Sequence, residues 1–182
     1  MTGTEINGAG INGTDRLAPL AMQVRELSDR IAISDLIDRY FLALDQGRFD
    51  QDYASRVFAE DVELSFPPGD HSGLPGLAAY TAGFMGHWKR THHHVTHHLI
   101  ALDGDRAEVG WNLFATHIHP DSPPPPAPGH HFYLGGRFEG EAVRTRDGWR
   151  MRRLTLRVSW TTGDGVPSIA KVMDDARAQA AR

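Results

Sequence analysis

The sequence predicts an α+β fold in which N-terminal helices cover a curved, cone-shaped antiparallel sheet. Helical patterns occupy most of residues 28–90, whereas strand patterns occupy most of residues 92–161. Two turns, at 103–105 and 146–148, contain Asp-Gly, which readily adopts the backbone of tight hairpins. Strands that follow one another through hairpins, rather than alternating with helices, favour an antiparallel sheet.

Length and charge restrict the class of protein. A chain of 182 residues fits one domain with a sizeable core, and a net charge of −4 provides no basic surface for nucleic acid or anionic lipid. No apolar run approaches the roughly 20 residues of a membrane span, and the N-terminus lacks a signal-peptide pattern. The absence of cysteine excludes disulfides and favours a cytoplasmic protein. We therefore expect no nucleic-acid and no membrane partner.

Three segments are expected along the chain: a flexible N-terminal arm (1–27), an α+β cone domain (28–162) and a C-terminal tail (163–182). The first 14 residues are rich in Gly, Thr and Asn, which is typical of disordered arms. A short helix at 15–25 is the only structure expected in the arm. The tail is polar and rich in alanine.

The clearest helix covers residues 28–46. Ser28 supplies an N-cap and Gly47 supplies a stop. Its apolar residues have the spacing of one helical face: Ile33, Leu36, Ile37, Tyr40, Phe41 and Leu44. Shorter helices are expected at 48–58 and 76–90.

Five strands are expected, at 62–66, 92–102, 107–115, 130–144 and 149–161. The proline-rich segment 120–129 cannot enter a sheet and favours a stiff, extended loop. That loop forms either a rim over a pocket or a surface excursion.

Five histidines lie within the seven residues 92–98. Because side chains alternate along a strand, His92, His94 and His98 are expected on one face, and His93 and His97 on the other. Imidazoles thus replace the Val or Ile of an ordinary core strand. This is a high density of the side chain that titrates near neutral pH.

Asp45 lies in the last turn of the first predicted helix. A carboxylate there faces the negative end of the helix dipole, which is locally unfavourable. Its position therefore indicates either a functional role or hydrogen bonds to local backbone donors.

Four stretches resemble the SnoaL-like branch of the nuclear-transport-factor-2-like superfamily. They are RIAISDLIDRYFLALDQGRFD (30–50), VFAEDVELSFP (57–67), THHHVTHHLIALDGDRAEV (91–109) and GGRFEGEAVRTRDGWRMRRLTLRVSW (135–160). The branch includes scytalone dehydratase, hexachlorocyclohexane dehydrochlorinase, bile-acid dehydratase and polyketide cyclases. The resemblance implies the α+β cone and a lyase or isomerase that works without a cofactor or metal.

The resemblance also implies a His-Asp pair. The Asp at the end of the family's first helix matches Asp45. The His begins the strand that ends in the Asp-Gly turn, and counting back from Asp105 places it at His92, with His93 as the alternative. A second catalytic histidine, found in some dehydratases, has four possible substitutes: His117, His119, His130 or His131.

Such a pair can act as a general base on a carbon acid. A carboxylate bonded to one ring nitrogen fixes the tautomer and leaves the other nitrogen free to take the proton. We expect His92 to be the base and Asp45 to orient it. Tyr40 is either a hydrogen-bond donor to the substrate or an ordinary core aromatic.

A small hydrophobic, cyclic substrate is expected in a pocket inside the cone. Arg157 would hold an anionic group if it points inward, although an outward, solvated arginine is the ordinary case. The candidate substrate-binding residues are His93, His94, Phe66, Phe84, Trp88, Trp111, Arg157 and Trp160.

Three other functions remain open on sequence grounds. His92-x-His94 and His117-x-His119 each place two imidazoles on one strand face, as in some zinc and iron sites. The same pocket would also suit a non-catalytic ligand-binding protein or the small subunit of a ring-hydroxylating oxygenase. In each case the outer face of the sheet would be covered by other copies, in a homodimer or homotrimer.

Overall fold

The computed structural model describes residues 13–67, 69–124 and 129–165, and it confirms the α+β class. Three helices and six strands follow one another in this part of the chain: α1 (Gly13–Asp45), α2 (Gln51–Val57), β1 (Phe58–Phe66), β2 (Gly69–Ser72), α3 (Leu77–Met85), β3 (Arg90–Asp103), β4 (Arg106–Ile118), β5 (His131–Thr145) and β6 (Gly148–Gly163). No described helix combines the length and apolar character that crossing a membrane requires.

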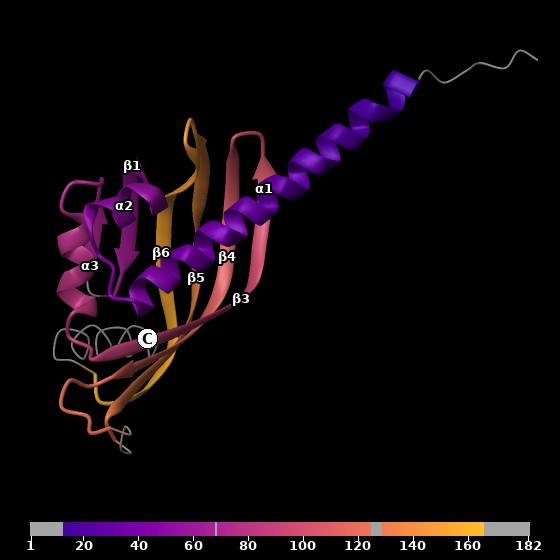
Figure 1. Ribbon diagram of the computed structural model, residues 1–182. Coiled ribbons are helices and arrows are strands. Elements are labelled where there is room, and N and C mark those ends of the chain that lie inside the picture. Colours follow the sequence, from indigo (N-terminus) through magenta and orange to yellow (C-terminus); the bar gives the residue numbers. More distant parts are fainter. Residues whose placement is uncertain (1–12, 68, 125–128, 166–182) are drawn as a thin grey trace, which may run out of the picture.

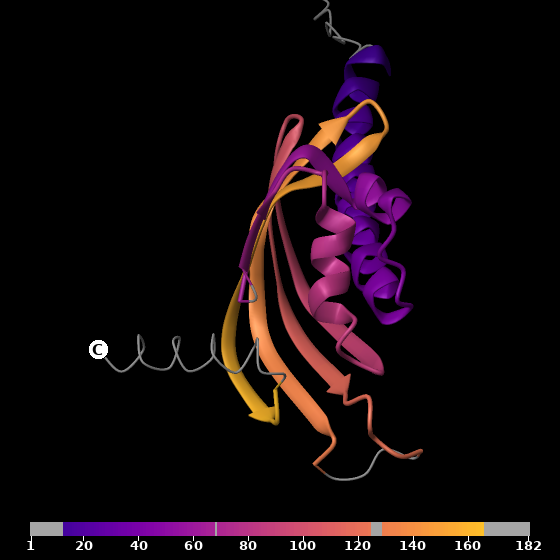
Figure 2. The same ribbon diagram turned by 90° about the vertical axis from the view of Figure 1, so that its left-hand side faces the viewer.

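The six strands form one curved sheet in the order β2-β1-β6-β5-β4-β3. The four long strands pair antiparallel through their hairpins, as expected, while β1 pairs with β6 in parallel. The helices lie on the concave face, and the convex face carries none of them (Figure 2). The strand β2 was not predicted, because it has only four residues and begins at the glycine of the Pro-Pro-Gly sequence.

The first helix is longer than the sequence analysis expected. It begins at Gly13 rather than at Ser28, which lies inside it. Residues 20–28 contain neither Gly nor Pro and are mostly good helix formers, so the helix continues through the presumed cap. Its N-terminal segment, up to Arg25, projects beyond the tip of the β3–β4 hairpin (Figure 1). The boundaries of the arm, domain and tail stay predictions, and residues 1–12 and 166–182 lie outside the described part.

The core lies between the concave face of the sheet and the helices. Its centre is aromatic: Phe138 stacks on Trp111 and meets the edges of Phe41 and Phe66. The predicted apolar face of α1 is buried in this core, with Ile33 and Ile37 fully enclosed.

A β-bulge interrupts the histidine-rich strand β3. The pairing of β3 with β4 shifts between Thr96 and Leu99, and His97 has a positive φ of 59°. A bulge adds one residue to a strand and reverses the alternation of faces beyond it. His98 therefore lies near Asp38 of α1, on the concave face, and His97 lies near Asn112. The simple alternation expected for 92–98 was wrong at these two residues.

Candidate functional site

Asp45, the last residue of α1, contacts the start of β3 through three hydrogen bonds. Its Oδ1 lies 2.6 Å from Nδ1 of His93 and accepts a 2.8 Å bond from the hydroxyl of Thr91. Its Oδ2 accepts a 3.0 Å bond from the backbone N–H of His93. The carboxylate is thus held by one short stretch of strand, which offsets its unfavourable place at the helix end.

The partner of Asp45 is His93 rather than His92. His93 points to the concave face and its side chain is 5% exposed. His92 points to the convex face, is exposed, and stacks on His94 at a ring distance of 4.3 Å. The bulge accounts for the difference through the alternation of faces: without it, the inward face of Ile100 and Leu102 would continue back to His92, and with it that face passes to His93. Thr91, two residues before His93, shares its face and was missed.

The geometry fixes the protonation pattern of the pair. Burial opposes ionisation of Asp45, but hydrogen bonds from the ring and backbone of His93 and from Thr91 outweigh it and lower the pKa of the carboxyl. Because an ionised carboxylate only accepts, Nδ1 of His93 carries the hydrogen, and Nε2 is left as the basic nitrogen.

A second histidine, His117 of β4, lies beside the first. The two rings meet edge to face at 5.6 Å, and His117 is almost fully buried. Its Nδ1 lies 3.3 Å from the carbonyl oxygen of Phe132, so Nδ1 donates and Nε2 carries the lone pair. Burial, together with His93, lowers the pKa of His117 to about 3. His117, one of the four substitutes considered for the family's second histidine, is therefore neutral at physiological pH.

Both histidines border a narrow cavity of about 70 Å³ between the sheet and the helices. The remaining lining is apolar, apart from the hydroxyl of Tyr40. Of the residues expected to bind substrate, His93, Phe66, Phe84 and Trp88 line this cavity, as does the candidate donor Tyr40. The lining residues outside the expected substrate-binding set are His117, which was considered only as a second catalytic histidine, and these apolar residues: Phe41, Pro67, Met85, Leu113, Ala115, Phe132, Leu134, Phe138 and Leu156.

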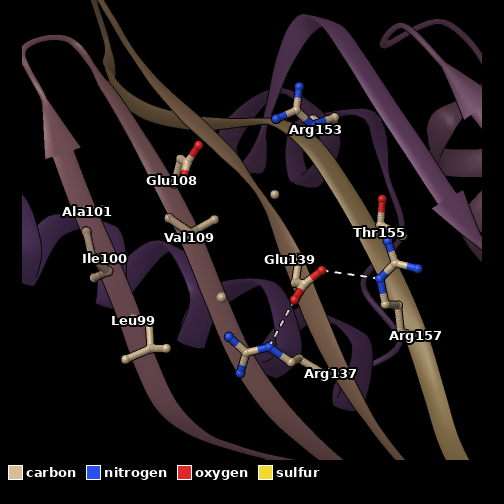
Figure 3. A pocket seen from close by; sticks show the side chains of 12 residues that line it. Leu99, Ile100, Ala101, Glu108, Val109, Arg137, Glu139, Arg153, Thr155 and Arg157 are labelled. Atoms are coloured by element: carbon tan, nitrogen blue, oxygen red, sulfur yellow. Dashed lines mark hydrogen bonds and ion pairs between the residues drawn. The ribbon is translucent and has the colours of Figure 1, made fainter.

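Four other expected substrate-binding residues lie elsewhere. Trp111 is fully buried behind the cavity, stacked on Phe138. His94 and Trp160 lie on the convex face, each against Phe114. Arg157 also points outward, where it donates a hydrogen bond to the exposed Glu139 (Figure 3). The alternation of β6 places it there, because its neighbours Leu156 and Val158 pack against the core.

The histidine pairs considered for a metal do not converge. His92 and His94 lie on the convex face, whereas His117 points to the cavity on the concave face. Within residues 13–67, 69–124 and 129–165, no three His, Asp or Glu side chains gather in the arrangement of a metal site. The proline loop expected over the pocket falls partly outside the described residues, and its role stays a prediction.

The comparisons with known proteins agree with this architecture. The SnoaL-like domain family matches residues 25–155. An uncharacterised protein of Mycobacterium tuberculosis (strain H37Rv) is 27% identical over 134 residues, covering 72% of this chain and 86% of that protein.

Two solved structures share the fold. A candidate scytalone dehydratase from Novosphingobium aromaticivorans is 24% identical, with a TM-score of 0.67 over 78% of this chain and 91% of the other. A hexachlorocyclohexane dehydrochlorinase from Novosphingobium barchaimii is 16% identical, with a TM-score of 0.65 over 80% and 99%.

Proposed function

The chain belongs to the SnoaL-like domain family, and within it we propose that this protein is a cofactor-independent lyase or isomerase. Its substrate is a small, largely apolar cyclic compound with an acidic C–H bond. One observation carries the proposal: His93, which is buried and bonded to the half-buried Asp45, borders an apolar cavity. Such a pair is the apparatus of general-base catalysis on carbon.

The proposed reaction begins with proton transfer from the substrate carbon to Nε2 of His93. Asp45, bonded to Nδ1, stabilises the imidazolium that forms, and Thr91 holds the carboxylate in place. In an elimination, the electron pair of the broken C–H bond forms the double bond as the leaving group departs. The imidazolium then returns its proton to a departing hydroxide, releasing water, or to another carbon in an isomerisation. A positioned base contributes roughly 10²–10⁴-fold to the rate.

Two further side chains at the cavity can bind oxygen atoms of the substrate. His117 is neutral and its Nε2 accepts, so it can receive a hydrogen bond from a hydroxyl group. Burial raises the pKa of Tyr40, so its phenol stays protonated and can donate to an enolate-like oxygen. A donor and an acceptor that line the same cavity as the base suit a hydroxylated carbonyl compound.

The size of the cavity favours a small substrate. Pockets for drug-sized ligands measure about 300–1,000 Å³, several times the volume found here. An apolar cavity that binds benzene measures about 150 Å³, so a ring compound enters this one only when the lining side chains move apart. Trp88 and Phe84 belong to the lining, so a ring compound would lie against aromatic faces. The names of two proteins that share the fold, a dehydratase and a dehydrochlorinase, denote eliminations and agree with this reaction class.

Solvent exchange tests the proposal directly, because it detects the first proton transfer whichever step follows. The protein is incubated in D₂O with a panel of cyclic β-hydroxy ketones, and NMR follows deuterium entry at the acidic carbon and loss of water. We expect exchange or elimination with at least one member. His93→Gln should lower that rate by about 10²-fold or more, whereas His92→Gln should leave it unchanged.

The two histidines form a matched pair, because they are neighbours in sequence on opposite faces of β3. Equal rates in the two variants would reject His93 as the base. Saturable binding of a ring compound with no exchange or turnover would instead support a ligand-binding protein.

A further inference from the structure

The N-terminal part of α1 carries a stripe of exposed apolar side chains, here called the α1 seam. Its residues are separated by three, four, three and four positions, and each is more than half exposed: Leu17, Leu20, Val24, Leu27 and Ile31. This spacing is the a/d repeat of a coiled coil. A continuous exposed apolar stripe of this kind marks an interaction surface.

The seam faces away from the rest of the molecule. Asp29, on the opposite side of α1, accepts hydrogen bonds from Arg144 of β5 and from the indole N–H of Trp149 in β6. Ile33 and Leu36 continue that side into the core. With 3.6 residues per turn, the seam lies about half a turn around the helix from these contacts. The domain therefore fixes the helix and leaves the seam open.

The seam is long enough and rigid enough to receive another helix. From Leu17 to Ile31 it extends about 21 Å. Its first part, from Leu17 to Val24, runs along the segment of α1 that projects past the β3–β4 hairpin (Figure 1), and its second part begins where Arg25 and Arg30 contact that hairpin. Because the projecting segment continues a helix already packed on the domain, a partner does not have to nucleate it.

We propose that the α1 seam binds the same seam of a second copy of this chain, as a parallel two-stranded coiled coil. In the heptad, Leu17, Val24 and Ile31 occupy position a, two of them β-branched, and Leu20 and Leu27 occupy position d. β-Branched residues at a with Leu at d favour parallel dimers over higher oligomers. The main contacts of each domain with α1, through Asp29, Ile33 and Leu36, lie on the side of the helix opposite the seam.

The residues beside the seam favour self-pairing. Of the four e and g positions between its ends, three are uncharged: Ala21, Gln23 and Ser28. Two identical helices therefore meet with little like-charge repulsion. The charged residues of this part of the helix are two basic and two acidic, which gives no basic face for an anionic membrane: Arg25, Arg30, Glu26 and Asp29.

Sedimentation of the full chain gives the first test. The wild type should sediment at twice the 20.1 kDa of one chain, and the double variant Val24→Glu, Leu27→Glu at the monomer mass. Met22→Glu is the matched control: Met22 is exposed and apolar but lies at position f, off the seam, so that variant should stay dimeric. A monomeric wild type, or a dimer that withstands the double substitution, would overturn the proposal.

Cross-linking gives a second test that does not depend on how the charged variant folds. The chain has no cysteine, so a single introduced thiol reports one contact. In a parallel pair, identical d positions face each other, so Leu20→Cys should form a disulfide-linked dimer on mild oxidation. Met22→Cys should not. Equal cross-linking of the two variants, or none for Leu20→Cys, would reject the parallel seam.

Discussion

The two faces of the sheet carry the same kinds of residue in opposite environments. On the concave face, His93 is buried and bonded to Asp45, and Phe138 lies at the aromatic centre of the core. On the convex face, His92 is exposed, and Phe114 is 40% exposed. A histidine-rich strand is therefore not in itself a site. The face that each histidine occupies decides which of them gains a carboxylate, a buried neighbour and a cavity.

This difference follows from what each face meets. The concave face meets α1 and α3, which exclude water and bring Asp45 to β3. The convex face meets none of the described helices, and its charges pair with one another in solvent, as Arg137, Glu139 and Arg157 do (Figure 3). The same substitution can be made at one residue of the concave face and at a similar residue of the convex face. The difference between the two effects then measures how much the faces differ.

Truncation of an aromatic residue should produce the largest contrast in stability. Phe138→Ala removes a fully buried ring that packs on Trp111, Phe41 and Phe66, and should lower the free energy of unfolding by about 3–5 kcal/mol. Phe114→Ala, on the convex face, should lower it by about 1 kcal/mol or less. Urea denaturation at pH 7 measures both. Similar losses for the two would show that the convex aromatic residues are also enclosed, as in an oligomer.

The pH dependence of the free energy of unfolding should also differ between residues of the two faces, by a smaller amount. The pKa of His117 is about 3 in the folded protein and near 6.5 in the unfolded chain, so only the unfolded state gains its proton between these values. The resulting stability is complete above pH 6.5 and declines as pH falls, by about 2 kcal/mol at pH 5. Asp45, whose pKa is lowered, loses its contribution only below about pH 4.

The variant His117→Phe should therefore flatten the decline in unfolding free energy between pH 7 and pH 5. His94→Phe, on the convex face, should leave that decline in place. Denaturation curves at the two pH values measure the slope for each variant. A slope that persists in His117→Phe would assign the acid sensitivity to another group.

The fold was predictable from the sequence because its signals are local and repeated. The apolar face of α1 from Ile33 to Leu44 and the two Asp-Gly turns each follow from neighbouring residues, and the structure confirms them. The start of α1 was not predictable from Ser28, because a good cap residue is also tolerated inside a helix. The α1 seam was not predicted either, because no other segment of the sequence indicates what would cover its apolar residues.

The site was predictable only to within one residue. The place of Asp45 at the end of α1 was correct, and so was the strand that it meets. The choice between His92 and His93 depended on the bulge at His97, whose positive φ could not be placed from the sequence because five histidines in the stretch share the same tolerance of that conformation. His117 was hidden for a similar reason, since its burial beside Trp88 and Phe132 depends on pairings across the sheet.

The smallest effect is expected for Arg157, which sequence analysis considered as a ligand for an anionic substrate group. Its guanidinium donates to Glu139 on the convex face, where both side chains are exposed and water screens their attraction. Arg157→Ala should therefore leave the urea midpoint unchanged, and it should not alter deuterium exchange into any substrate that His93 activates. A clear loss of exchange in this variant would mean that the convex face contributes to the site, which would contradict the separation of the two faces.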